Sequence, residues 1–181
     1  MRGQGGRCIF SREMDSVLLC TLLLCGFGLG VASLGWGPPD PAPRPAAVYK
    51  MCPAGWTRYR GDCYLYDDTE LTWIQAELHC ISNHGNLATI QNQHQYTFLR
   101  SLIFKSAGTH KRTWVGGYDG VEEGTWLWSR GTKFDFTQWG PEEPNDFEGN
   151  EDCMEINREG EDFVNDIRCG RENSFICVRR P

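Results

Sequence analysis

The sequence predicts an α+β domain with two helices and antiparallel strands, and three observations support this fold class. Two segments with the apolar spacing of helices come first, and short strand-like runs separated by turns follow them. Helices that precede strands in this way are typical of an α+β domain with an antiparallel sheet. Six cysteines lie in the same part of the chain, an even number that suits three disulfides.

Composition limits the class of protein. The chain has 181 residues, 40% of them hydrophobic and seven of them Trp, which is enough for one domain with a real core and a short extension. The net charge of −6 argues against a nucleic-acid partner, because that partner requires a basic surface. Three of the nine cysteines lie in an N-terminal stretch of different character. The other six point to an oxidising compartment, although their spacing does not choose among the possible pairings and contains no close Cys-x-x-Cys pair for zinc: Cys52, Cys63, Cys80, Cys153, Cys169 and Cys177.

The N-terminal apolar run has the layout of a secretory signal peptide. Three arginines precede Val17–Leu34, and the run ends in small residues. We therefore expect residues 1–35 to be a signal peptide cleaved between Ser33 and Pro38, so that the protein is secreted and extracellular. The run is just long enough to cross a membrane, which leaves a signal anchor, and with it a membrane-anchored type II receptor, as the alternative.

A linker precedes the domain. Residues 36–51 are rich in Pro and Ala and show no apolar period, so we expect an extended linker there and a folded domain over residues 52–181. The first part of the domain alternates apolar and polar residues around positions 61–62. This pattern indicates a hairpin tied by Cys52 and Cys63.

Two helices are expected next. Thr72 and Gln75 have the spacing of a capping box, and the helix that they begin ends before Gly85. Asn92 is placed as the N-cap of a second helix, which ends before Gly108. Both helices carry an apolar stripe that should pack on a common sheet: Trp73, Ala76 and Cys80 in the first, and Tyr96, Leu99 and Ile103 in the second.

Short strands and one long loop complete the domain. The loop over residues 133–150 is too rich in Gly, Pro and Asn for regular structure, and ordered loops of this length are usually functional. Strands are expected at residues 113–119, 125–129, 153–157, 162–166 and 174–178.

Acidic residues are concentrated around this loop. Between Asp119 and Asp166 the chain has fifteen Asp or Glu residues against three Lys or Arg. Such crowding is self-repelling unless cations or solvent offset it. Carboxylate and amide oxygens are the ligands that calcium prefers, so the pattern predicts a calcium site, with a solvated acidic loop as the alternative.

The motifs along the chain resemble those of the C-type lectin-like domain family. The resemblance covers the chain from Cys52 to its end, and the overall plan also resembles the small secreted single-domain lectins of fish and their antifreeze relatives. It implies a double-loop fold of the long form, with disulfides Cys52–Cys63, Cys80–Cys177 and Cys153–Cys169. The motifs that carry it occur in this order: CPAGW from Cys52, Cys63-Tyr64, Thr72-Trp73, Leu87-Ala88-Thr89-Ile90, Trp114-Val115-Gly116 and Phe175-Ile176-Cys177.

The resemblance also implies a set of ligands. A sugar-binding calcium would be held by Glu143, Asn145, Glu151, Asn165 and Asp166, with a cis peptide bond before Pro144. The family usually has Trp before the Asn-Asp pair, whereas this chain has Val164. An auxiliary calcium, which only some members have, would be held by Asp119, Glu123, Asp146, Glu151 and Asp152.

These features predict a calcium-dependent lectin. In the family, the triplet Glu-Pro-Asn accompanies mannose, N-acetylglucosamine and fucose, so glycans or glycoproteins with mannose-type sugars are the expected partners, in innate recognition. Two sugar hydroxyls would complete the calcium shell, giving protons to Glu143 or Glu151 and accepting hydrogen bonds from Asn145 or Asn165. Phe147 flanks the site loop and is placed to contact a sugar. Because one such site binds weakly, a homo-oligomer would supply avidity.

Two other classes of function remain to be weighed. The same fold could bind protein or ice without sugar. A glycosidase would use two carboxylates as acid and base, and we expect no enzyme, because calcium claims these carboxylates and none is expected in an apolar pocket that raises its pKa.

Overall fold

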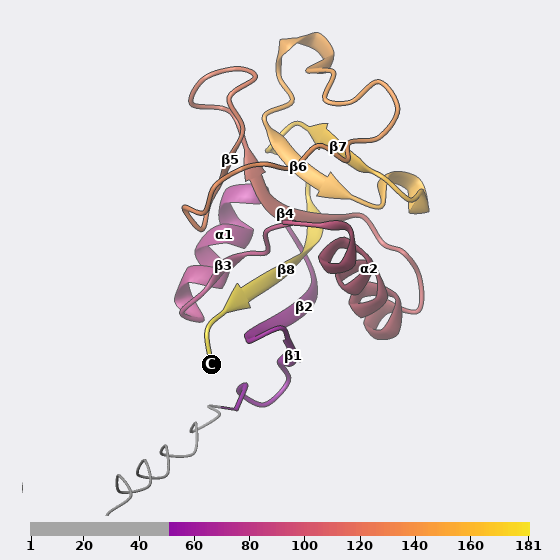
Figure 1. Cartoon of the computed structure of the whole chain (residues 1–181). Helices are drawn as coiled ribbons and strands as arrows, with labels where there is room; N and C mark the ends of the chain where they lie inside the picture. Colours follow the sequence, from indigo (N-terminus) through magenta and orange to yellow (C-terminus); the bar gives the residue numbers. More distant parts are fainter. Residues whose placement is uncertain (1–50) are drawn as a thin grey trace, which may run out of the picture. The chain divides into compact units, whose positions relative to one another are not determined.

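The computed structural model describes residues 51–181, which form the domain shown in Figure 1. The expected signal peptide at 1–35 and the linker up to residue 50 lie outside the described residues. Within the described part, no helix is both long and apolar enough to span a bilayer.

The domain contains two helices, eight strands and two short 3-10 turns. Helix α1 follows the long strand β2, and helix α2 follows β3, so the helices precede most of the strands as predicted. The elements are β1 (Thr57–Tyr59), β2 (Asp62–Leu71), α1 (Trp73–Ser82), β3 (Asn86–Leu87), α2 (Gln93–Ala107), β4 (Thr113–Tyr118), β5 (Leu127–Trp128), η1 (Phe147–Gly149), β6 (Cys153–Ile156), η2 (Arg158–Gly160), β7 (Val164–Ile167) and β8 (Asn173–Arg179).

Both helices begin where the sequence predicts, for the predicted reason. In α1, the Gln75 side chain accepts a hydrogen bond from the Thr72 backbone N–H at 3.1 Å, as a capping box requires. In α2, the Asn92 side chain accepts from the Gln95 N–H at 3.0 Å. The second helix ends at Gly108, which has a φ of 78° that suits glycine.

The strands form one mixed sheet in the order β1-β2-β8-β4-β6-β7, with β3 paired to β8 and β5 to β4. The expectation of a purely antiparallel sheet is wrong at one pair, because β4 and β8 run parallel, with Thr113 opposite Ser174 and Trp114 opposite Phe175. β4 comes from the middle of the domain's sequence and β8 from its end, and the long connection between them allows either direction.

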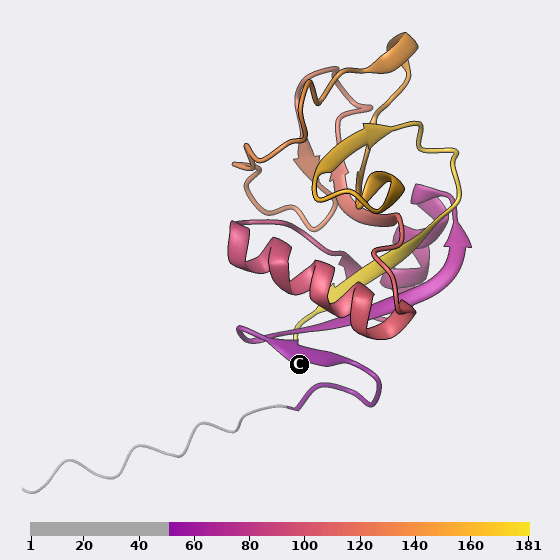
Figure 2. The same cartoon turned by 90° about the vertical axis from the view of Figure 1, so that its right-hand side faces the viewer.

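Successive residues of the central strands face opposite sides of the sheet, and each side carries one helix. Trp114 and Phe175 pack with α1, whereas Val115 and Ile176 pack with α2. Figures 1 and 2 show the two helices on either side of β8. The helices therefore share the sheet but not the same face of it.

The three disulfides have the pairing that the resemblance implies. They join Cys52 to Cys63, Cys80 to Cys177, and Cys153 to Cys169. The second ties α1 to β8 across 97 positions of sequence. The third joins the start of β6 to the residues after β7, the strand that carries Asn165 and Asp166, and so ties these ligands to the end of the long loop.

A buried carboxylate connects α1 to the sheet. Glu77 is 6% exposed and accepts hydrogen bonds from the Leu87 N–H at 2.8 Å, the Asn86 amide at 2.6 Å and the Ser129 hydroxyl at 3.0 Å. These three hydrogen bonds offset the free-energy cost of burying the carboxylate. Figure 1 shows β6, β7 and the long loop before β6 at the end of the domain away from the C-terminus, where the predicted site lies.

Candidate functional site

Strand β7 and the loop before β6 supply the predicted ligands. Asn165 and Asp166 are adjacent on β7, which pairs with β6 so that Met154 lies opposite Asp166. The loop is attached to β7 by backbone contacts, since the Gly140 N–H donates to the Val164 carbonyl at 2.8 Å. A side chain added at Gly140 would overlap Phe163, which explains why glycine occupies this close approach.

Asp166 organises the loop. Its carboxylate accepts hydrogen bonds from the backbone N–H of Asn145, at 3.1 and 3.2 Å, and from the N–H of Asp146 at 2.8 Å. The Glu143–Pro144 peptide bond is cis, as the resemblance implies. Asp166 is 1% exposed, so these bonds form largely away from solvent.

Hydrogen bonds link the five predicted residues into one cluster. The Asp146 carboxylate accepts from the Glu151 N–H at 3.0 Å, and this bond connects Glu151 to the Asp166 group. Nη1 of Arg158 lies 3.3 Å from Oε1 of Glu143 and 3.2 Å from Oδ1 of Asn165. The structure therefore brings all five residues to one place.

One oxygen in this cluster has no partner. Oε2 of Glu143 is buried and accepts no hydrogen bond from the described residues, and the Glu143 side chain is only 4% exposed. A buried carboxylate oxygen without a partner is costly. The predicted ligands offer carboxylate and amide oxygens, a donor set that suits a hard cation such as calcium, and the Arg158 guanidinium contacts two of these oxygens. The predicted ligand residues therefore fit that ion.

The electrostatics of the cluster agree with this interpretation. Burial raises the pKa of Glu143 to about 7, and the adjacent Asp166 carboxylate adds to the rise while Arg158 opposes it. Burial also raises the pKa of Glu151, where the N–H of Phe147 acts in the opposite direction. The assumption that no carboxylate here has a raised pKa is therefore wrong for Glu143, because the loop folds over it and places a second carboxylate beside it.

Asn165 uses its two amide hydrogens within the protein. Its Nδ2 donates to Oε1 of Glu155 at 3.2 Å and to the Asp166 carbonyl at 2.6 Å. Only the Oδ1 side of Asn165 faces the other ligands. By contrast, the exposed Asn145 side chain makes no hydrogen bond to the described residues.

Sequence reasoning missed Glu155 as a supporting residue. It is fully buried on β6 and accepts from Asn165 and, at 2.9 Å, from Nδ2 of Asn173. Burial raises its pKa, whereas Arg112 and the two amides lower it. The alternation of β6 offered a signal, because Glu155 stands between the core residues Met154 and Ile156 and so faces the opposite side of the strand.

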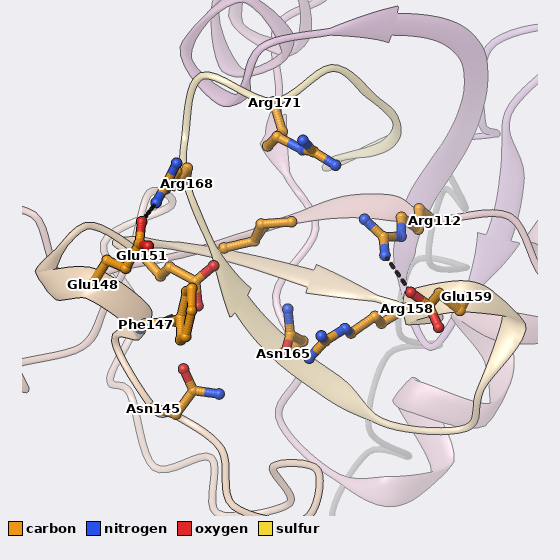
Figure 3. Close-up of a pocket in the computed structure, with 11 residues that line it drawn as sticks. Arg112, Asn145, Phe147, Glu148, Glu151, Arg158, Glu159, Asn165, Arg168 and Arg171 are labelled. Atoms are coloured by element: carbon orange, nitrogen blue, oxygen red, sulfur yellow. Dashed lines mark hydrogen bonds and ion pairs between the residues drawn. The ribbon is translucent and has the colours of Figure 1, made fainter.

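Arg158 was also missed. It is one of only three cationic residues between Asp119 and Asp166, yet its charge is opposite to that of a metal ligand, so the pattern did not single it out. Figure 3 shows its side chain directed toward Asn165. Its guanidinium contacts two oxygens that the resemblance assigns to calcium.

The predicted auxiliary site is present in part as an acidic group. Carboxylate oxygens of Asp119, Glu123 and Asp152 lie within 4.8 Å of one another. Asp119 is buried, its Oδ1 has no partner among the described residues, and burial raises its pKa to about 6. The other two residues predicted here, Asp146 and Glu151, are not in this group of three.

Two further predictions concern residues beside the site. Val164 is 1% exposed, lies in the core cluster against which Trp139 packs, and pairs with Trp139 through an isolated β-bridge. Phe147 is 62% exposed and lines the cavity beside the ligands, the location from which a ring can contact a bound molecule.

Comparisons with known proteins identify the family of the chain. The family described as Lectin C-type domain matches residues 69–179. The galactose-specific lectin nattectin of Thalassophryne nattereri is 39% identical over 128 residues, which are 71% of this chain and 80% of that protein. The lactose-binding lectin l-2 of Anguilla japonica is 40% identical over 134 residues, covering 71% of this chain and 78% of that protein.

A solved structure shows the same fold. The herring type II antifreeze protein superposes with a TM-score of 0.67 at 28% sequence identity, covering 72% of this chain and 99% of that one. The family match spans α1 to β8, and the alignments with the two lectins cover most of the length of those proteins. The chain therefore belongs to the C-type lectin domain family.

Proposed function

We propose that the protein is a calcium-dependent lectin that binds mannose-type sugars outside the cell, in innate recognition of glycans. The observation that carries this proposal is the buried, partnerless Oε2 of Glu143, on a side chain that lies beside the Asp166 carboxylate and, together with Oδ1 of Asn165, contacts Arg158. An ion that binds these oxygens would satisfy the orphaned atom and offset the crowded charge.

The proposed ligand residues would have different hydrogen-bonding roles toward the sugar hydroxyls. Calcium, when bound, supplies a centre at which two neighbouring hydroxyl oxygens can replace water. Glu143 and Glu151 are acceptors for the hydroxyl protons. Because the amide hydrogens of Asn165 are engaged with Glu155 and the backbone, the amide donor to the sugar is assigned to Asn145, whose side chain is exposed.

The sugar type rests on this order of donors and acceptors. The names of two relatives specify galactose and lactose, so membership of the family does not by itself set the sugar. The triplet Glu143-Pro144-Asn145 places a carboxylate acceptor first and an amide donor second. Exchanging the two groups would keep the charge and the oxygen ligands while reversing the pattern that the hydroxyls meet.

The test is the double substitution Glu143→Gln with Asn145→Asp. On a glycan array with calcium, the unmodified protein should bind mannose-type glycans and lose them in chelator, and the variant should shift toward galactose while still requiring calcium. The matched control is Glu142→Gln with Asn150→Asp, two exposed positions in the same loop, which makes the same chemical exchange and should leave specificity unchanged. Calcium-dependent binding of galactose rather than mannose by the unmodified protein would overturn the sugar assignment.

Three subsidiary proposals follow. The three disulfides support an extracellular location, which N-terminal sequencing of the secreted product would test against a type II membrane anchor. A single site with millimolar affinity has about −4 kcal/mol of binding free energy, so we expect oligomers on multivalent glycans, measurable by light scattering. We expect no hydrolysis of a labelled glycan, because the raised pKa of Glu143 belongs to a residue of the proposed calcium site.

The likeness to an antifreeze protein favours ice as the second candidate. Ice binding would appear as thermal hysteresis in the absence of any glycan interaction. The array and the hysteresis measurement therefore separate the two functions on the same preparation.

A further inference from the structure

A cavity of about 550 Å³ adjoins the proposed calcium ligands, and its walls are unusually cationic for this acidic domain. Asn145, Glu151 and Asn165 line the side that faces the ligands. The remaining walls hold four arginines together with Glu148 and Glu159 (Figure 3). Arg158, Arg168 and Arg171 come from the residues on either side of β7, and Arg112 directly precedes β4. The volume is in the range of small-molecule sites.

Three of these arginines have partners. Arg168 pairs with Glu148, and Nη1 of Arg158 contacts Glu143 and Asn165. Arg112 pairs with Glu159 at 3.5 Å, and the Glu159 side chain is 75% exposed. The Arg112 side chain is 26% exposed and also acts on the buried Glu155, so it is held in the cavity wall, and its single contact with Glu159 leaves guanidinium hydrogens for a second acceptor.

Arg171 is different. It is exposed, and within residues 51–181 its guanidinium makes no hydrogen bond or ion pair. It also lines a second cavity of about 600 Å³ on the other side, together with Lys111 and Arg112. Arg112 and Arg171 therefore stand in the wall that the two cavities share, and Figure 3 shows the Arg171 guanidinium directed toward Arg112.

Two neighbouring guanidinium groups, one of them without a counter-charge, favour an anion between them. Guanidinium groups bind the oxygens of a planar carboxylate or a sulfate through paired hydrogen bonds. We propose that this cavity binds the sulfate or carboxylate group of an acidic saccharide, through Arg171 and Arg112, while a neighbouring part of the same saccharide occupies the proposed calcium site. The inference rests on the proposed function and adds the class of sugar: acidic rather than neutral.

The experiment compares neutral and acidic forms of one sugar on the full-length protein. Titration calorimetry in calcium buffer would use N-acetylglucosamine, its 6-sulfate, and a disaccharide that joins it to glucuronic acid, so that the two acidic arms distinguish sulfate from carboxylate. The unmodified protein should bind at least one acidic form about tenfold more tightly than the neutral sugar, and the advantage should shrink with added salt.

The variant Arg171→Gln should reduce the acidic advantage to less than about twofold while leaving the affinity for the neutral sugar unchanged. Arg112→Gln should reduce it in part. Arg180→Gln is the matched control, because it removes the same charge from a side chain that is 87% exposed and outside both cavities. Equal melting temperatures would show that the variants remain folded.

The outcomes separate this inference from the proposed function. Calcium-dependent binding of the neutral sugar without an acidic advantage overturns the inference and leaves the function standing, as does an advantage that Arg171→Gln retains. Acidic binding that persists in chelator and disappears in Arg171→Gln supports the cavity and overturns calcium dependence. Binding of none of the three sugars overturns both.

Discussion

The ion-free domain should lose stability as pH rises from about 5 to 7.5, and calcium should restore it. Glu143 has its pKa raised from 4.5 to about 7, and Asp119 from 3.8 to about 6. A folded-state pKa above the unfolded value means that folding favours the protonated form. Stability from these two groups is therefore fully present below their unfolded pKa values and is lost as pH rises through 6 and 7.

The magnitude follows from the size of the shifts. One pKa unit corresponds to about 1.4 kcal/mol. Solvent screening and the interaction of Glu143 with Asp166 reduce the loss of unfolding free energy expected from the two shifts to about 1 to 2 kcal/mol. For a domain of this size, that loss lowers the melting temperature by roughly 3 to 8 °C. Bound calcium requires ionised ligands, so its stabilising effect should grow over the same pH range.

Thermal unfolding followed by circular dichroism would measure the melting temperature at pH 5, 6 and 7.5, in chelator and in about 5 mM calcium. This calcium concentration is above the dissociation constants of up to about 10⁻³ M that extracellular calcium modules typically have. Glu143→Gln cannot titrate at this position and should remove the Glu143 share of the pH dependence in chelator while leaving that of Asp119, whereas Glu142→Gln, an exposed neighbour, should remove neither. The difference between these variants cancels the titration of all other groups. A calcium effect of the same size at pH 5 and 7.5, or identical pH profiles for the two variants, would refute the reasoning.

Two further predictions concern the fold. Replacing Gly85 by Ala would bring its Cβ within 2.4 Å of the Val178 carbonyl oxygen and should cost about 1 to 3 kcal/mol in denaturant unfolding, whereas Gly170→Ala, with no atom within 4 Å, should change little. Replacing Cys80 and Cys177 by Ser opens a loop of 97 positions, a loss of about 4 to 5 kcal/mol in the chain-entropy model; a variant that melted cooperatively within a few degrees of the unmodified protein would contradict it.

Local features were predictable because the sequence encodes them locally. The capping box at Thr72 and the N-cap at Asn92 place both helices, since each depends on residues within one turn. The buried Glu77 was also within reach, because it lies four positions after Trp73 on the same helical stripe.

Long-range pairing was not predictable in the same way. The parallel alignment of β4 with β8 joins segments about sixty residues apart, and neither strand carries a local sign of its partner's direction. β2 extends to Leu71, well beyond the hairpin that its alternation indicates, because β8 supplies its partner as far as Asn173.

The sequence was sufficient to propose the ligand residues of the candidate site, but not the protonation of Glu143 or the position of the nearby cation. Residue types and the family resemblance pointed to Glu143 and Asp166, yet the raised pKa of Glu143 depends on burial by a folded loop. Arg158, in the irregular turn η2, contacts oxygens of Glu143 and Asn165, and no periodic pattern encodes this placement.

The position of β8 sets the order in which the domain can be completed during synthesis. β8 pairs with β2, β3 and β4, so the last strand to be made is the one that joins the first half of the sheet to the second. A nascent chain that stops before Asn173 has none of these three pairings, and its Cys80 cannot form its native disulfide until Cys177 has emerged. The sheet can therefore close, and the disulfide between α1 and β8 can form, only after the last strand of the domain has been made.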